Sequence, residues 1–344
     1  MGIAVSLVVI AYNEAGNIGR TLDAIAALHG LDEYEVVVVN DGSRDGTADV
    51  VRDRAARNPR IRLIDLPKNR GRGYARSTGI AAAGGELIAT VDADIILPPD
   101  WFVRASAALA GHDAVGGTAV PDGDVAYVYQ STRLVPRVIG HTTTVTGSNA
   151  LYRRRVFEIV GFDPALREGE DVALNQATAA GGLSFATVPG LLVEHIENKT
   201  FGESLRWLFV TGTGATRQLL NYRQIRVPDL AAGVWLASAA AGVAIAVLVS
   251  PFALALPVLL LAVIAARHVS SRFETPAARW RSATAAVAFD SALLLAYFTG
   301  RLAGLSWLFR KRPGAVRPPG VTQPGVTQPG VTRSGSASLG SPRS

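Results

Sequence analysis

Residues 87–94 read Leu-Ile-Ala-Thr-Val-Asp-Ala-Asp, an apolar run that ends in two carboxylates. Two similar runs precede it: residues 3–10 read Ile-Ala-Val-Ser-Leu-Val-Val-Ile, and residues 35–40 read Glu-Val-Val-Val-Val-Asn. Strands that are apolar along their whole length are typical of parallel sheets, which are covered on both faces. Amphipathic helix patterns lie between the runs, at residues 17–28 and 47–57. This alternation predicts an α/β domain with a mostly parallel central sheet flanked by helices.

Polar segments follow the first two predicted strands. Ala11-Tyr12-Asn13-Glu14 comes after the first, and Asn40-Asp41-Gly42-Ser43 comes after the second. Ligands of such sheets bind beyond the carboxyl ends of the strands, where Asp41 would be able to accept hydrogen bonds from a nucleobase or a ribose. Each segment alone also fits an ordinary strand-to-helix turn, because Asn, Asp, Gly and Ser are the common turn residues.

Residues 69–76 form a basic, glycine-containing segment, Asn-Arg-Gly-Arg-Gly-Tyr-Ala-Arg. Backbone N–H groups and guanidinium groups before a helix suit a diphosphate. The segment is not the dinucleotide-binding fingerprint, because Arg76 occupies the place of its third glycine. An ordinary basic helix start remains the alternative for this segment by itself.

Asp92-Ala93-Asp94 stands where the third predicted strand ends. Two carboxylates this close repel each other, and a cation is the usual partner that makes their burial tolerable. Oxygen ligands favour Mg²⁺ or Mn²⁺, and Mg²⁺ commonly takes one or two carboxylates together with substrate phosphates. The alternative is an acidic turn that caps a following helix.

The charge of the chain is divided unevenly along its length. Residues 1–228 carry 23 Lys and Arg against 25 Asp and Glu, whereas residues 229–344 carry 11 against 3. A basic C-terminal third favours positive loops beside anionic lipid over a nucleic-acid groove on the folded domain. The chain has no cysteine, which excludes disulfides and thiolate metal sites.

The apolar character rises after residue 228. Residues 230–266 contain no charged residue, and residues 282–300 form a second apolar stretch. As one helix the first stretch would be about 55 Å long, well beyond the ~30 Å hydrocarbon core of a bilayer. We therefore expect two or three transmembrane spans within residues 229–305, with a buried apolar helical domain as the alternative. The Pro-Gly-Val-Thr repeats in residues 306–344 predict a disordered tail.

In their order along residues 3–217, these segments resemble the family 2 glycosyltransferases, which have the Rossmann-like GT-A fold. Ala11 replaces the proline usual in that family, and Ser204-Leu205-Arg206-Trp207 lacks the preceding Gln of processive synthases, which indicates a non-processive enzyme. The resemblance implies donor-side contacts at Ala11, Tyr12, Asn13, Glu14, Asp41, Asn69, Arg70, Gly71, Arg76, Asp92 and Ala93. It implies acceptor-side contacts at Gly147, Ser148, Asn149 and Glu170, and Arg217 is expected near the lipid headgroups as a further substrate contact.

The same resemblance implies an inverting mechanism. Asp94 and His195 would hold Mg²⁺ or Mn²⁺ against the diphosphate of a UDP- or GDP-sugar, and Asp171 would act as the catalytic base. The expected acceptor is lipid-linked, with residues 1–228 as a catalytic domain on the cytoplasmic side of the cell membrane. Two other readings are a non-catalytic nucleotide- or glycan-binding membrane protein and a nucleotidyltransferase. The latter would usually carry a Gly-rich basic loop directly after the first strand, which this sequence lacks.

Overall fold

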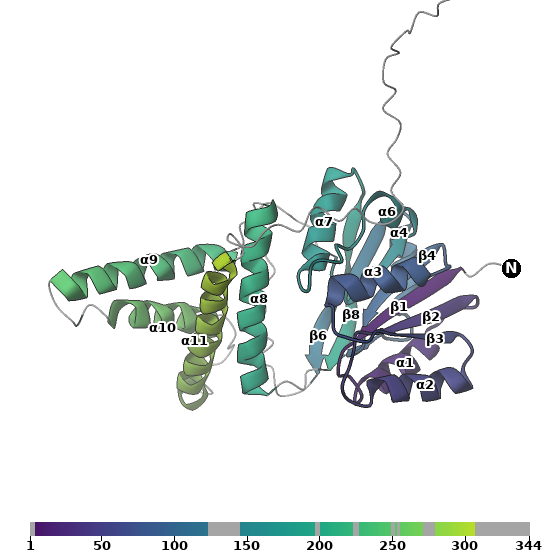
Figure 1. Ribbon diagram of the computed structural model, residues 1–344, viewed down its shortest axis with the longest axis horizontal. Coiled ribbons are helices and arrows are strands. Elements are labelled where there is room, and N and C mark those ends of the chain that lie inside the picture. The colour runs from purple at the N-terminus through teal and green to yellow at the C-terminus, as the bar shows by residue number, and fades with distance from the viewer. Residues whose placement is uncertain are drawn as a thin grey trace, which may run out of the picture.

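The computed structural model describes residues 4–122, 145–196, 200–222, 227–248, 252, 255–270 and 279–306. Figure 1 shows an α/β unit that includes the sheet, and beside it the helices α8 to α11. The elements run in the order β1 (Val5–Ala11), α1 (Ile18–Ala26), β2 (Tyr34–Asn40), α2 (Thr47–Arg57), β3 (Ile61–Asp65), α3 (Arg72–Ala82), β4 (Leu87–Asp92), β5 (Ile95–Ile96), α4 (Trp101–Leu109), β6 (Ala114–Asp122), β7 (Asn149–Arg153), α6 (Arg155–Ile159), α7 (Glu170–Ala180), β8 (Phe185–Ile196), α8 (Phe201–Tyr222), α9 (Val227–Leu248), α10 (Ala255–Ser270) and α11 (Arg279–Gly304).

The strands form one sheet in the order β3-β2-β1-β4-β7-β6-β8-β5. The three apolar runs of the sequence are the adjacent strands β2, β1 and β4, and β1 pairs in parallel with both of its neighbours. Beyond β4 the sheet is mixed, because β7 pairs antiparallel with β4 and with β6, while β6 pairs in parallel with β8. The parallel part therefore matches the sequence prediction, and the mixed part adds strands that the runs did not indicate.

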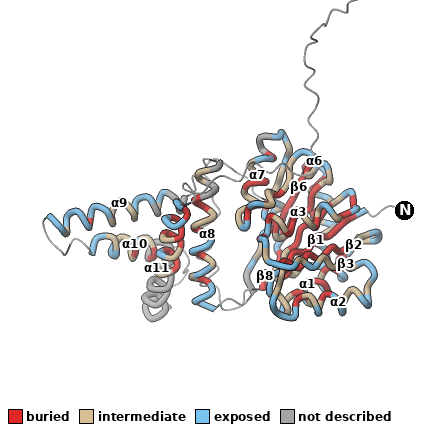
Figure 2. The backbone as a smooth tube through the Cα atoms, in the orientation of Figure 1, coloured by how far each residue is buried: buried red, intermediate tan, exposed pale blue. Residues whose placement is uncertain are grey.

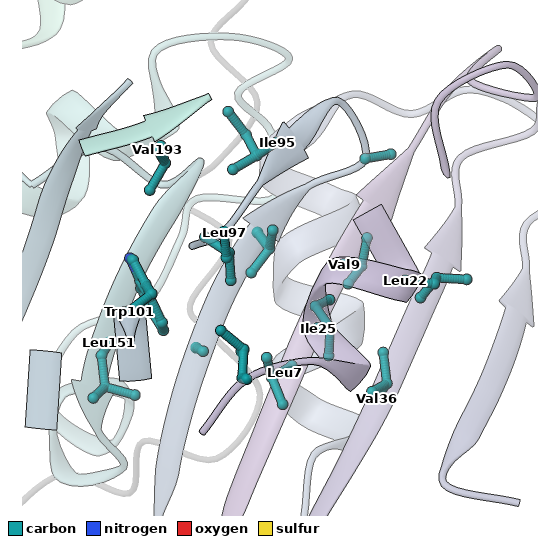
Figure 3. Close-up of a cluster of buried hydrophobic side chains, with 14 of the residues drawn as sticks. Leu7, Val9, Leu22, Ile25, Val36, Ile95, Leu97, Trp101, Leu151 and Val193 are labelled. Carbon is teal, nitrogen blue, oxygen red and sulfur yellow. The ribbon is translucent and has the colours of Figure 1, made fainter. Parts of the chain in front are cut away.

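Helices on both faces explain why β1 is buried along its whole length. One of them is α1, which turns Leu22 and Ile25 into the same cluster as Leu7 and Val9 of β1 (Figure 3). The spacing of the apolar positions in α1 places them on one face of the helix. Burying each such side chain contributes about 1.5–3 kcal/mol. Figure 2 shows the buried residues concentrated in the sheet.

Helices α8 and α11 pack backbone against backbone. A Cβ at Gly300 would lie 2.1 Å from the carbonyl oxygen of Phe209, and a Cβ at Gly212 would lie 2.3 Å from that of Tyr297. The Thr216 hydroxyl also donates a hydrogen bond to a main-chain carbonyl of α11, at 2.8 Å. The sequence predicts that this segment belongs to the catalytic domain, and in the structure α8 packs mainly against α11.

The transmembrane spans expected for residues 229–305 are not found: within the described ranges, no helix has the length and apolar composition that crossing a bilayer requires. Helices α9 and α10 nevertheless expose several large apolar side chains, among them Val247 (79% exposed) and Leu248 (82%). Phe252, between the two helices, is 87% exposed. Almost all of the predicted disordered tail, residues 307–344, lies outside the described residues.

Candidate functional site

The loops after β1 and β2 are fastened to each other by hydrogen bonds. The Asn13 N–H donates to Ser43 Oγ at 2.8 Å, and the Glu14 N–H donates to Thr47 Oγ1 at 2.8 Å. Asn13 has a positive φ of 57°, and its side-chain oxygen accepts the N–H of Arg44 at 2.9 Å. These bonds hold both loops at the carboxyl edge of the parallel strands, where the sequence predicts a donor site.

Asp41 fastens the basic segment to the end of β2. One carboxylate oxygen accepts the Arg70 N–H at 2.7 Å, and the other accepts the Gly71 N–H at 2.8 Å. Burial raises the pKa of Asp41, and the two hydrogen bonds offset only part of this rise. Gly71 has a φ of 95°, and a Cβ there would lie 2.5 Å from the Cα of Arg167, so the loop requires glycine at this position.

Asp94 and His195 come together where β5 pairs with β8. Ile95 is the register partner of His195, and His195 Nε2 lies 2.9 Å from Asp94 Oδ2. Within the described residues, no group of three or more His, Cys, Asp or Glu side chains is arranged around a common metal position. The pair supplies one carboxylate and one imidazole, a donor set that fits a divalent cation whose other ligands are phosphate oxygens and water.

Arg76 is buried between two carboxylates rather than open to a ligand. Its Nη2 donates to Asp92 Oδ1 at 2.5 Å, and its Nη1 donates to Glu170 Oε1. Arg76 and Glu170 are each only 2% exposed. Both were predicted to contact substrate, but the structure places them beneath the site, where they contact each other.

A pocket of about 520 Å³ opens over these loops. It is bounded by the ends of β1 and β4, the start of α3, the segment before α7, and one face of α8. Its lining residues are Ile10, Ala11, Tyr12, Glu14, Asp41, Asn69, Gly71, Arg72, Ala75, Asp92, Ala93, Asp94, Arg167, Glu168, Arg206, Val210, Thr213 and Gly214.

Several lining residues were not predicted from the sequence. Arg72 begins α3. Desolvation lowers its pKa, but the nearby carboxylates, chiefly those of Asp92 and Glu168, raise the pKa above its usual value. Burial also raises the pKa of Glu168, against the opposing effect of Arg72 and Arg167. Arg206 reaches the pocket from α8. The pocket thus contains cations that the sequence pattern did not distinguish from neighbouring arginines.

Other predicted residues lie outside the lining. Asn149 is fully buried, and its side-chain oxygen accepts the Gly117 N–H at 2.7 Å. The carbonyl of Ser148 accepts the Asp92 N–H at 3.0 Å, so this predicted acceptor-side segment supports the pocket floor. The side chain of Arg217 lies outside the described residues. Also absent from the lining are Asn13, Arg70, Arg76, Gly147, Glu170, Asp171 and His195.

Asp171 lies in the first turn of α7, next to Glu170. Its Oδ1 accepts the N–H of Val172 at 2.8 Å. Its charge contributes to the raised pKa of Arg72, which is a pocket residue. The structure therefore places the candidate base beside the buried Glu170 and outside the residues that line the pocket.

Residues 6–161 match the family model described as Glycosyl transferase family 2. The succinoglycan biosynthesis protein ExoO of Rhizobium meliloti (strain 1021) is 36% identical over 224 residues, which are 59% of this chain and 63% of that protein. The undecaprenyl-phosphate 4-deoxy-4-formamido-L-arabinose transferase of Aeromonas hydrophila subsp. hydrophila is 31% identical over 163 residues, 45% of this chain and 50% of that protein. The chain thus spans less than two thirds of each of these relatives.

Among solved structures, the mannosyltransferase PcManGT from Pyrobaculum calidifontis, in complex with GDP-Man and Mn²⁺, is similar with a TM-score of 0.56. It is 25% identical, and the match covers 87% of this chain and 86% of that one. The matched segment of the family model begins in β1 and ends just after α6, so it contains the loops that carry Asp41, Asp92 and Asp94. Residues 6–161 of the chain are therefore similar to the family 2 glycosyltransferases, and the similar solved structure supports a GT-A-like fold.

Proposed function

We propose that the chain transfers a sugar from a nucleotide-sugar donor to a lipid-linked acceptor, with inversion at the anomeric carbon. The observation that carries the proposal is a pocket whose lining includes Asp41, Asp92 and Asp94 together with the cations Arg72 and Arg206. A nucleoside diphosphate sugar presents the matching groups, because it has hydrogen-bond donors on the base and ribose and negative charge on the diphosphate.

The donor would lie along the carboxyl edge of β1, β2 and β4. Asp41 forms the pocket wall beside the glycine loop, where a base or ribose would contact it. Arg72 and Arg206 face the pocket from α3 and α8, and guanidinium groups bind phosphate oxygens with two parallel hydrogen bonds. A UDP- or GDP-sugar is the donor that we propose, and the GDP-Man in the similar structure supports this class.

Asp94 and His195 would hold Mg²⁺ or Mn²⁺, and the Mn²⁺ of the similar structure supports a divalent cation. Such an ion, when bound, neutralises charge on a diphosphate leaving group. The protein itself positions the two ligands, because the β5–β8 pairing sets the distance between them.

Asp171 would be the base that takes the proton from the acceptor hydroxyl as it attacks the anomeric carbon. Its place in the first turn of α7 supports this role, because Glu170 anchors that turn through Arg76. A base held on a rigid element can approach the acceptor from the side opposite the diphosphate, as inversion requires.

A lipid-linked acceptor and a membrane setting form the next part of the proposal. The relative from Aeromonas hydrophila is named for transfer involving undecaprenyl phosphate, a lipid. The exposed apolar side chains of α9 and α10 support contact with lipid, since apolar patches of this kind mark interaction sites. We propose that residues 1–228 face the cytoplasm at the cell membrane, where nucleotide sugars are available.

A donor screen tests this proposal directly. UDP-, GDP- and CMP-sugars, each with Mn²⁺, are compared by the shift they cause in thermal unfolding, and release of nucleoside diphosphate is then measured for the best donor. We expect wild type to turn over, Asp94→Ala to lose most turnover, and Asp171→Asn to bind donor without transferring sugar. Equal background rates for all three proteins would instead favour the second candidate, a non-catalytic nucleotide- or glycan-binding protein of the same fold.

A further inference from the structure

Arg76 joins two parts of the site that are far apart in the sequence. Its guanidinium contacts Asp92, the last residue of β4, and Glu170, the first residue of α7. The Asp92 side chain is 22% exposed and lines the pocket, whereas Arg76 and Glu170 are almost fully buried. One buried cation therefore links the pocket wall to the helix that carries Asp171.

The surroundings of the guanidinium leave it little freedom. A Cβ at Gly147 would lie 2.8 Å from Arg76 Cζ, so a larger residue there would displace the guanidinium from its present position. On another side, the Phe162 ring centroid lies 5.5 Å from the same atom. The planar fork of Arg76 can contact both carboxylates at once, and a lysine ammonium, which is a compact point charge, cannot reproduce that geometry.

Stability alone does not account for this arrangement. Burying three charged groups carries a desolvation penalty that their attraction often fails to repay, and apolar residues of similar volume can do as well. Among the residues that the structure describes, the buried atoms Arg76 Nε and Glu170 Oε2 have no hydrogen-bond partner, which adds to the cost. A network that is expensive to bury and only partly satisfied suggests a role in the site.

We propose that Arg76 is a positioning residue that fixes the separation between the donor-side carboxylate of Asp92 and the candidate base Asp171. The inference rests on the proposed function. By holding Glu170, Arg76 fixes the start of α7 and therefore the residue that follows, Asp171. By holding Asp92 Oδ1, it also orients that carboxylate at the pocket wall.

The two sides of the network can be tested separately. Glu170→Gln keeps the contact between Arg76 and Asp92 but removes the charge that anchors α7. We expect its kcat to fall about tenfold to a hundredfold, while its donor KM stays within about threefold of wild type. Arg76→Lys removes the planar guanidinium that contacts both Asp92 and Glu170. We therefore expect its kcat to fall and its donor KM to rise.

Asp113→Asn is the matched control. Asp113 is also a buried carboxylate, 4% exposed, which accepts hydrogen bonds from Arg155 and from the Ser184 N–H. It does not line the pocket. We expect the control to lower the melting temperature while leaving kcat and donor KM unchanged.

A folded Glu170→Gln variant with the kcat of wild type would overturn the proposal. So would a kcat loss that merely follows the loss of folded protein, as judged against Asp113→Asn. If Arg76→Lys does not fold, the kcat of Glu170→Gln decides; if neither folds, the network is structural and the proposal fails. If the wild-type protein neither binds nor turns over any nucleotide sugar, the proposed function itself is wrong. If wild type is active and the variants have its kcat and donor KM, only the positioning role of Arg76 is wrong.

Discussion

His195 Nε2 lies 2.9 Å from Asp94 Oδ2, although 101 residues separate the two along the chain. Asp94 follows β4 and precedes β5, while His195 is near the end of β8, the strand that pairs with β5. The side chains are similarly buried, at 18% and 17% exposure. The structure thus brings together two side chains that the sequence could only associate through a resemblance.

Substitution of either Asp94 or His195, the two proposed metal ligands, should raise the divalent cation concentration that turnover requires. We expect Asp94→Asn and His195→Gln each to raise the Mn²⁺ concentration for half-maximal turnover by at least about tenfold. Initial rates measured across a Mn²⁺ titration check this. Asp100→Asn is the control, because this exposed carboxylate lies before α4 and outside the pocket. Identical titration curves for all three variants would show that the pair does not hold the ion.

Arg72 should contribute to donor binding. Its guanidinium carries a positive charge and lines the pocket at the start of α3, where it can contact a diphosphate. We expect Arg72→Met to raise donor KM or the donor dissociation constant about tenfold, as the loss of one charge-assisted hydrogen bond would do. Calorimetric titration with the donor measures it. Arg104→Met, at a half-buried position of α4 outside the pocket lining, should bind donor as wild type does. A similar loss of affinity in this variant would point to a general charge effect.

Glu168 should make stability depend on pH. Burial raises its pKa above the ordinary value of 4.5, so the folded state holds the proton more tightly than the unfolded state. The resulting stabilisation is complete below the ordinary pKa and is lost as the pH rises through the pKa of the folded state. We therefore expect Glu168→Gln to have a higher melting temperature than wild type near neutral pH, and the difference to disappear in acid. Asp49→Asn removes an exposed carboxylate and is the control. Its difference in melting temperature from wild type should not depend on pH in this way.

The contact between α8 and α11 should affect the pocket from a distance. A Cβ at Gly300 would lie 2.1 Å from the Phe209 carbonyl oxygen, so Gly300→Ala must push the helices apart. We expect a loss of about 1–3 kcal/mol in the free energy of unfolding. Donor KM should also rise, because Arg206 of α8 lines the pocket. Chemical denaturation and donor kinetics measure the two effects.

Gly233→Ala in α9 is the matched control, since a Cβ there meets no atom within 4 Å. A helix-interior alanine should stabilise this position by about 0.5–1 kcal/mol. Unchanged stability and unchanged KM in Gly300→Ala would mean that the pocket does not depend on the helix contact.

The first part of the fold was predictable because its residues carry the information locally. The apolar runs that became β1, β2 and β4 are buried on both faces, and their period and composition indicate this directly. The strand β8 was not predicted, because only a few of its residues are buried and the rest are half-buried or exposed. Such a pattern is weak in a sequence, although it fits a strand near the sheet edge.

The site was predictable only in part, for a physical reason. Position after a buried strand indicated Asp41, Asp92 and Asp94, and all three line the pocket. Arg72 and Arg76 belong to the same basic segment, yet the first faces the pocket and the second is buried in an ion network. Their difference depends on which way each side chain turns on α3 and on where α7 lies, and no local pattern contains that information.

The strand β5 consists of only Ile95 and Ile96 and lies at the edge of the sheet, paired with β8. A polypeptide emerging from the ribosome presents every loop of the parallel strands long before it presents β8. Until that late strand docks, the edge is open and Asp94 has not met His195. Newly made protein should therefore pass through a stage in which the loops after β1, β2 and β4 are present but Asp94 and His195 are not yet paired.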